Sequence, residues 1–452
     1  MAGIGWKLQK MIDRGSVGGS MGAYMTGIAV TCAPWLLTTS VLMSIRLFAR
    51  GDESPLFPLV EHLVTFVYAL TVILSAPVHV VVSRYTADRL YDKHLERVPA
   101  PLWRMLNLTL FAFLGIGILL VVLLRPPVTI GVVGVFLTAV VGAQWLLLGV
   151  GGGLCSPVVV LRAFCIGAPL GMAAALWLCR GLGLGALGYL IGFTVGQVVT
   201  LVIIFRGVAG AIPRDGDEQA RIRPAFSEYW LLAISSLVYY LSIWTDKVVI
   251  WVLAGPAAAS QHSSVAAIAW FSVVPAFGWV YVQIETVFYR RFRSFYQGLN
   301  GGSALSVLRQ AASAIASEAK RILRGAVLVQ AVVLGIGLAA APEMMRLASL
   351  PTSLAPQFRV AMVGASLQLV SWLEILLLYY FDLRDEALLV SVALLGGVIG
   401  LVAGAYGLGA SPTDGYALAS GLAAGVGLYL VRTRLSTLLT DTFQAQSFGN
   451  TL

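Results

Sequence analysis

Four charged side chains lie well inside apolar stretches of this sequence: Arg162, Asp246, Lys247 and Glu374. A charge at the centre of a bilayer costs on the order of 2.5–3.5 kcal/mol on insertion scales, so each one needs a partner or a task. Asp246 and Lys247 are adjacent, hence about 100° apart around a helix, and we expect each to find a partner elsewhere. Pairing Asp246 with Arg162 and Lys247 with Glu374 is one arrangement. These groups either fix helix packing or line a water-filled path, and the second interpretation is favoured.

Aromatic side chains share helical faces with some of these charges. One face has the spacing i, i+4, i+7 and i+11 and holds Tyr240, Trp244, Lys247 and Trp251. A second face holds Tyr281, Glu285, Tyr289 and Phe292. Carboxylates bond sugar hydroxyls, aromatic faces stack on sugar rings, and the same faces attract organic cations. The pattern favours a path for a carbohydrate or a cationic drug, with an interfacial aromatic belt or helix packing as the alternative.

Further titratable residues lie nearer the ends of apolar stretches. Glu61 and His62 follow the start of one stretch, and His79 and Glu285 precede the ends of two others. Their side chains can reach the membrane interface, so they are weaker candidates. Glu61 and Glu285 are retained as candidate path residues. The four cysteines form no C-x-x-C pair, and no metal ion or cofactor is expected.

Composition and apolar runs predict the elements that carry these residues. Of 452 residues, 58% are hydrophobic and 11% are charged, against about 25% charged in an average soluble domain. Apolar runs of about 20 residues, the length that spans a bilayer, occur near 22–48, 59–82, 103–124, 128–149, 154–178, 182–205, 229–255, 264–289, 325–341, 359–381, 387–409 and 414–431. The sequence therefore predicts an all-α polytopic membrane protein with about 12 transmembrane helices.

The distribution of basic residues predicts the orientation. With the N-terminus inside, inner loops and tails hold 22 of the 30 Lys and Arg residues, and outer loops hold six. Basic residues concentrate on the cytoplasmic side of membrane proteins, so both termini are predicted to be cytoplasmic. The net charge of +9 is spread over these loops and forms no soluble basic module, which argues against nucleic-acid binding.

The predicted organisation has two groups of six helices. Its parts are an amphipathic N-terminal segment, the first bundle, a cytoplasmic inter-bundle loop, the second bundle and a cytoplasmic tail, at 1–21, 22–205, 206–228, 229–431 and 432–452. Within the second bundle, a cytoplasmic loop near 290–324 has an apolar helical face from Leu305 to Ile322. This face is predicted to lie on the membrane surface, or else to meet a cytoplasmic partner.

Short motifs along the chain resemble a known family. They are AGIGW at 2–6, GAY at 22–24, APWLL at 33–37, SRYTADRLY at 83–91 and WTDK at 244–247. They resemble the PelG family, the membrane subunits of bacterial Pel exopolysaccharide export systems, within the superfamily of multidrug, oligosaccharidyl-lipid and polysaccharide flippases. The resemblance covers the whole chain in length and layout. It marks Trp244, Asp246 and Lys247 as a signature without assigning their role.

The resemblance implies a fold, a function and partners. The family fold is two six-helix bundles around a central cavity. The implied function is export of an N-acetylgalactosamine-rich polysaccharide through the inner membrane of a Gram-negative bacterium, for the biofilm matrix. Implied partners are PelD, PelE and a cytoplasmic glycosyltransferase, besides the polymer and the lipid bilayer.

Other functions remain open from the residues alone. An antiporter of the same fold would exchange drugs for ions, or flip a lipid-linked oligosaccharide. An enzyme is disfavoured, because no Asp-x-Asp signature or phosphate-binding glycine loop occurs, and the loop after Tyr289 holds one acid, Glu318. A scaffold for a synthesis complex is the remaining alternative.

Overall fold

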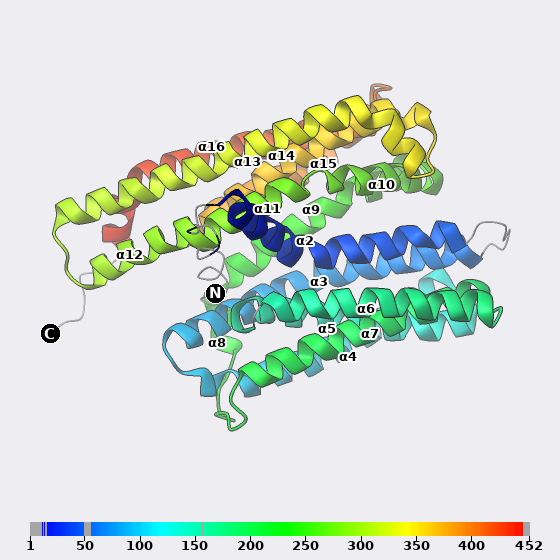
Figure 1. Cartoon of the computed structure of the whole chain (residues 1–452), viewed down its shortest axis with the longest axis horizontal. Coiled ribbons are helices and arrows are strands. Elements are labelled where there is room, and N and C mark those ends of the chain that lie inside the picture. The colour runs from blue at the N-terminus through cyan, green and yellow to red at the C-terminus, as the bar shows by residue number, and fades with distance from the viewer. Residues whose placement is uncertain (1–10, 12, 14–15, 49–55, 156, 446–452) are drawn as a thin grey trace. The chain divides into compact units, whose positions relative to one another are not determined.

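A computed structural model describes residues 11, 13, 16–48, 56–155 and 157–445. Every regular element in this part of the chain is a helix (Figure 1). Contacts divide the chain into two compact units, residues 32–241 and residues 2–31 with 242–452. Helices α2 (Val17–Phe48) and α9 (Trp230–Ala254) each contribute residues to both units. The predicted amphipathic N-terminal segment lies mostly outside the described residues.

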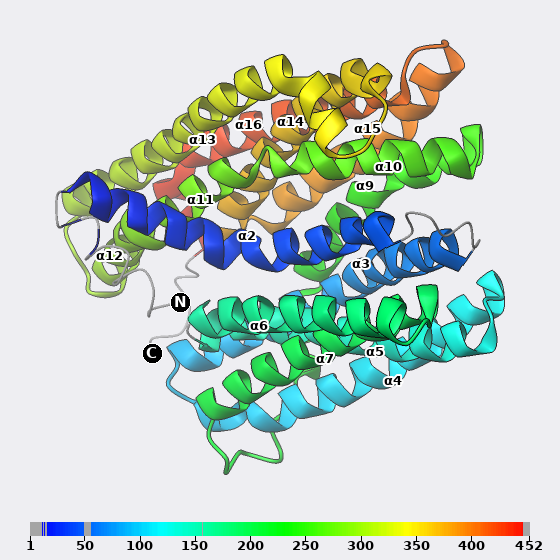
Figure 2. The same ribbon diagram turned by 45° about the vertical axis from the view of Figure 1, so that its right-hand side comes forward.

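Unit 1 is built around long apolar helices. They are α3 (Leu56–Tyr91), α4 (Pro99–Leu124), α5 (Val128–Leu154), α6 (Pro157–Leu176), continued by the π-helical turn η2 (Trp177–Gly181), and α7 (Gly185–Ala211). Figure 2 shows α6 beside α7 and α4 beside α5, pairs that also make extensive contacts. The short helices η1 (Leu95–Arg97) and α8 (Arg223–Glu228) lie outside these apolar spans. Its core includes a large cluster of aliphatic and aromatic side chains, among them Leu63, Leu137 and Phe193.

Unit 2 contains the remaining helices. They are α10 (Pro256–Phe271), α11 (Val274–Gln283), the π-helical turn η3 (Ile284–Phe288), α12 (Tyr289–Asn300), α13 (Leu305–Leu347), η4 (Thr352–Leu354), α14 (Ala355–Tyr380), α15 (Arg384–Gly407) and α16 (Pro412–Ala445). Helix α16 packs on α14 and α15, and α13 packs on α14. Pro275, at the start of α11, has no backbone N–H to continue α10, and the chain bends by 45° there.

The predicted fold class is confirmed. Ten helices in the described residues are long and apolar enough to cross a membrane, and the bent pair formed by α10 with the α11–α12 stretch adds an eleventh. The predicted first span coincides with α2. In hydrocarbon every backbone N–H and C=O must be paired within its own helix, which is why the apolar runs give helices. The protein is an all-α, multi-pass membrane protein.

The amphipathic stretch near 305–324 does not lie on the membrane as predicted. It is the first half of α13, a single helix of 43 residues that continues through the apolar run 325–341. Its apolar face is buried, with Ile315, Ala319 and Ile322 all fully inaccessible. Helix α12 packs alongside this half and covers the face. The interpretation failed because the covering helix was not recognised in the sequence.

The inter-bundle loop is held against other parts of unit 1. The Asp217 backbone N–H donates to the Glu96 carbonyl at 2.7 Å, and Arg104 Nη2 donates to the Glu218 carbonyl at 2.6 Å. The Tyr229 hydroxyl donates to Asp88 Oδ2 at 2.6 Å. Burial, together with the Asp88 carboxylate, raises the pKa of Tyr229, so the phenol keeps its proton and remains a donor at neutral pH.

Glycines allow α6 and α7 to approach closely. A methyl group on Gly192 of α7 would overlap the backbone of Ala174 and Ala175 in α6. A methyl group on Gly196 would come within 2.7 Å of the Gly167 carbonyl oxygen. Small residues at such crossings bring backbones together, which strengthens packing where hydrophobic burial offers no driving force.

This contact predicts a difference between two glycines of α7. Gly192→Ala should destabilise unit 1 by about 1–3 kcal/mol, because the added methyl group meets backbone atoms that cannot move aside. Gly210→Ala is the matched control, since no described atom lies within 4 Å of a methyl group there. The midpoint of thermal unfolding of the detergent-purified protein measures both. Equal midpoints for the two variants would contradict the close packing.

Candidate functional site

A buried carboxylate with two basic partners lies in unit 2. Asp246 of α9 is 1% exposed. Its Oδ2 lies 2.8 Å from Nε2 of His262 in α10, and its Oδ1 lies 2.8 Å from Nζ of Lys247. Both contacts are short enough for strong hydrogen bonds to an ionised carboxylate. They offset the cost of removing the Asp246 charge from water.

The network continues through two polar side chains. His262 Nδ1 lies 3.2 Å from Thr413 Oγ1 at the start of α16, and Gln357 Nε2 at the start of α14 donates to the same oxygen at 3.1 Å. If His262 is neutral with its proton on Nε2, every hydrogen bond of the chain has a defined direction. Gln357 donates to Thr413, Thr413 donates to His262, and His262 donates to Asp246. The network thus connects α9, α10, α14 and α16 near one end of unit 2.

The expectation that Asp246 and Lys247 are poor partners was wrong. The Lys247 side chain folds back along α9, so that Nζ donates to the Ile243 carbonyl at 2.9 Å and to both Asp246 oxygens. Nζ also lies 5.9 Å from the centre of the Trp244 ring. A flexible four-carbon stem overcomes the 100° separation of adjacent residues. The ammonium group is therefore not paired with Glu374.

Glu374 is buried in a different way. The residue is fully inaccessible in α14, and neither carboxylate oxygen has a hydrogen-bond partner among the residues the structure describes. The side chain packs on Gly427 of α16, where a methyl group would overlap its carboxylate. A buried acid without a partner is a costly feature, and in membrane proteins such acids mark functional positions.

The other candidate residues are dispersed. Arg162 is exposed on α6, in the second turn of the helix. Glu285 is 7% exposed within the π-helical turn η3, a feature often found at functional sites. Glu61 is half-buried in the second turn of α3. Tyr240 packs edge-on against His79 at 6.0 Å between ring centres.

The two aromatic faces have different environments. On α9, Trp244 is half-buried beside Lys247, and Trp251 is 50% exposed. On the second face, Phe292 belongs to an aromatic cluster that also contains Phe288, Tyr296, Tyr380 and Phe381. Phe292 therefore packs against other aromatic side chains, which was one of the two alternatives to a role in the transport path.

His262 was not recognised in the sequence as a candidate. The apolar run was taken to begin at 264, which left His262 in a loop. Gly255 has φ +86°, and Pro256 stands at the first helical position, so α10 begins eight residues earlier than the run. Pro at the first position after a Gly turn is a helix-start signal that could have placed His262 on α10.

A second buried carboxylate lies at the opposite end of unit 2. Glu318 of α13 is 1% exposed, and its carboxylate binds Arg321 at 2.5 Å and Arg291 at 3.4 Å. Arg321 also donates to Gln283 at 2.8 Å, and Gln283 donates to the Tyr24 hydroxyl at 3.0 Å. The network joins α2, α11, α12 and α13. The only acid of the loop after Tyr289 is thus used to hold helices together.

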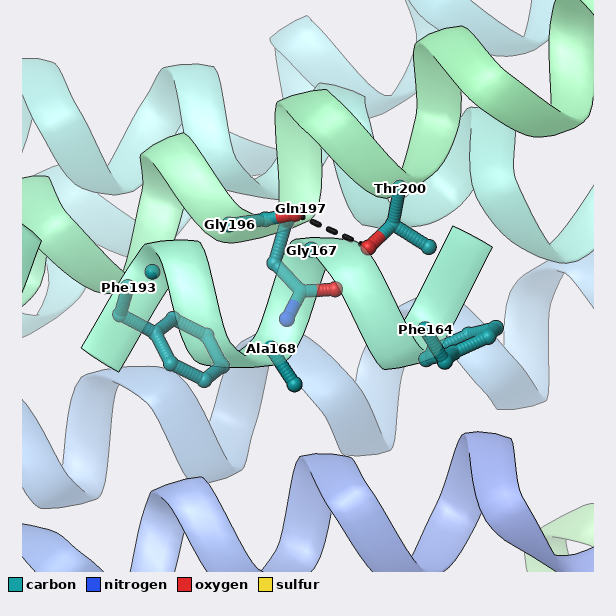
Figure 3. Close-up of a pocket in the computed structure, with 8 residues that line it drawn as sticks. Phe164, Gly167, Ala168, Phe193, Gly196, Gln197 and Thr200 are labelled. Atoms are coloured by element: carbon teal, nitrogen blue, oxygen red, sulfur yellow. Dashed lines mark hydrogen bonds between the residues drawn. The ribbon is translucent and has the colours of Figure 1, made fainter. Parts of the chain in front are cut away.

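A small cavity lies between α6 and α7 in unit 1 (Figure 3). Its volume of about 10 Å³ suits a single water molecule. Gln197 lines it, and Oε1 of this residue has no hydrogen-bond partner in the described part of the chain. Figure 3 also shows the Thr200 hydroxyl bonded to the Gly196 carbonyl, at 2.9 Å. The cavity is far too small for a sugar and is no substrate site.

The fold is that of a class of membrane transporters. An outward-facing multidrug resistance MATE transporter of the MOP superfamily aligns with a TM-score of 0.67 and 14% identity, covering 92% of this chain and 96% of that chain. An inward-facing MATE transporter aligns with a TM-score of 0.65 and 15% identity, covering 92% of this chain and 99% of that chain. MATE in the bent conformation aligns with a TM-score of 0.65 and 16% identity, covering 96% of this chain and 97% of that chain. At these identities the likeness concerns the fold alone.

The sequence identifies the family within this fold. Residues 1–443 match the model of the PelG family, described as "Putative exopolysaccharide Exporter (EPS-E)". The match covers nearly the whole chain, and the chain belongs to the PelG family. No curated protein matches the sequence significantly. The resemblance recognised from the short motifs is thereby confirmed.

The Asp246 network predicts a marked asymmetry between single and paired substitutions. Asp246→Asn should destabilise the protein by about 3 kcal/mol, because it removes the buried carboxylate and leaves the half-buried Lys247 ammonium group without its counter-charge. The double variant Asp246→Asn with Lys247→Met should recover part of this loss, since both charges are removed together. Thermal unfolding in detergent measures the coupling between the two positions.

The control for this prediction is Asp382→Asn. Asp382 pairs with Arg384 at 2.7 Å, but its side chain is 57% exposed, so its loss should have little effect. Strictly additive effects of Asp246→Asn and Lys247→Met would show that the two side chains are not coupled.

Proposed function

We propose that this protein exports an exopolysaccharide from the cytoplasm to the periplasm across a bacterial inner membrane, for the matrix of a biofilm. The observation that carries the proposal is the match of residues 1–443 to the exopolysaccharide exporter family. The transporter fold supports it. The proposed cargo is an N-acetylgalactosamine-rich Pel polymer, and the protein is proposed to move it without catalysing a reaction.

The proposed orientation has both termini in the cytoplasm. Support comes from the concentration of Lys and Arg in alternate loops, since basic loops remain on the cytoplasmic side. The proposed partners are PelD, PelE and a cytoplasmic glycosyltransferase that supplies the polymer. Membership of the PelG family supports them.

The proposed path residues divide by exposure into two roles. Trp244, Lys247 and Tyr240 are half-buried on α9 and could contact sugars, the aromatic rings by stacking. Asp246, Glu374 and Glu285 are buried, so they would act on the path through charge and helix position. Arg162 and Glu61 are proposed to lie along the path in unit 1.

A second function is an ion-coupled antiporter of a small molecule or lipid-linked oligosaccharide. Glu374 favours it, because a buried acid without a partner can bind a cation or a proton during a transport cycle. Ion-gradient-driven efflux in vesicles, without any change in surface polymer, would support this alternative.

Glu374→Gln gives a clean test of the proposed path. Glutamine has the shape of glutamate, and no ion pair with a described residue is lost, so the membrane level of the protein should hold. Surface polymer should fall by about tenfold, equivalent to roughly 1.4 kcal/mol in the transport step. Fractionated cells are assayed for hexosamine polymer inside and outside, with membrane levels measured in parallel.

The matched control is Glu343→Gln, the same change at a residue exposed on α13. It should leave both surface polymer and protein level unchanged. Unchanged surface polymer in Glu374→Gln would remove Glu374 from the path. Unchanged surface polymer after deletion of the whole protein would refute the export function itself.

A further inference from the structure

Helices α12 and α13 form a hairpin that extends beyond the apolar span. Helix α13 has 43 residues, or about 65 Å at 1.5 Å per residue, whereas the hydrocarbon core is about 30 Å thick. Figure 1 shows α12 running beside the first half of α13. Arg291 Nη1 of α12 donates to the Ala314 carbonyl of α13 at 2.8 Å, which fixes the two helices side by side.

The hairpin carries a large excess of positive charge. Residues 290–324 contain seven Lys and Arg residues and one acid, Glu318. Arg291 and Arg321 neutralise Glu318. The remaining basic residues have no acidic partner among the described residues: Arg290, Arg293, Arg309, Lys320 and Arg324. The surface is therefore suited to an anionic ligand.

A groove on this hairpin gathers several donors. Its volume is about 360 Å³, and it is lined by Val287, Arg290, Arg291, Ser294, Ala311 and Ala314. Arg290 Nε donates to the Thr286 carbonyl at 3.2 Å, which anchors its guanidinium group. Arg291 is anchored through the Ala314 carbonyl. Each guanidinium group keeps further N–H donors for a ligand, and the two alanines leave the groove open.

We propose that this groove binds a phosphate group. A phosphate ester presents several acceptor oxygens and up to two negative charges. Arg290 supplies a positive charge that no described acid neutralises, while Arg291, whose charge is shared with Glu318, and the Ser294 hydroxyl supply further donors. A carboxylate has fewer oxygens and one charge, so it would leave donors unused. The groove has room for a phosphate with an attached group.

The position of the groove favours a soluble phosphate ester over a lipid headgroup. Ala314 lies 11 residues before Gly325, where the apolar run begins, so the groove is about 16 Å farther along α13. The headgroup layer on each side of a bilayer is only about 5–8 Å thick. Lys320 and Arg324 lie closer to the apolar run and are better placed for lipid phosphates.

The test uses the full-length protein in nanodiscs of neutral phosphatidylcholine, with inorganic pyrophosphate as the probe in calorimetry. The wild-type protein should bind it saturably. Arg290→Gln should weaken binding by about tenfold through loss of a charge-assisted contact. Arg293→Gln is the matched control, with the same charge change on α12 outside the groove lining, and should change affinity by less than about twofold.

A second arm distinguishes the source of the phosphate. Nanodiscs containing phosphatidylglycerol should compete with pyrophosphate if lipid headgroups reach the groove, and should not compete if the ligand is soluble. Either result keeps a phosphate site, provided that Arg290→Gln weakens it selectively. If Arg290→Gln and Arg293→Gln weaken pyrophosphate binding equally, binding depends only on the overall positive charge of the hairpin, and the proposal is overturned. The absence of saturable binding in both arms would also overturn it.

Discussion

A backbone amide inside hydrocarbon finds no water, so its hydrogen bond must be made within its own helix. This constraint produces the all-helical fold. The same lack of water also limits which side chains can lie inside the membrane. Helices that gain nothing from hydrophobic burial associate through close packing, as at Gly192 and Gly196 of α7. A charge that enters the same environment must bring its own partners, as Asp246 does with Lys247 and His262.

Two buried carboxylates, Asp246 and Glu318, are paired in this way, and each connects several helices of unit 2. The Asp246 network connects helices near one end of the unit, and the Glu318 network connects helices at the other. Because removal of one partner from a buried pair leaves a stranded charge, each network opposes local rearrangement of its helices. Glu374 is also buried, but neither of its carboxylate oxygens has a hydrogen-bond partner among the residues that the structure describes. Asp246 and Glu318 thus hold helices together through their partners, whereas the described contacts give Glu374 no such role.

Apolar length is a local property, and for that reason the sequence predicted the fold class and the approximate positions of the long apolar helices. The candidate site depended on contacts that no local pattern contains. The pairing of Asp246 with Lys247 follows from a side-chain conformation, not from helical spacing. His262 became visible only once α10 was seen to begin at Pro256. The face around Ile315 was misassigned because α12, its cover, is itself short and strongly basic.

The chemistry of Lys247 limits what the α9 face can bind. Its ammonium group has three donors, and they are directed at the Ile243 carbonyl and the two Asp246 oxygens. A hydrogen bond to a carboxylate is roughly twice as strong as one between neutral groups, so a sugar hydroxyl cannot displace Asp246 from Lys247. A neutral sugar would therefore meet the Trp244 ring, while Lys247 stays bound to Asp246. Only an anionic group could compete for the ammonium, and its arrival would leave Asp246 with His262 alone. If cargo follows the path proposed along α9, this face would discriminate between neutral and anionic groups by how far each one disturbs the buried network.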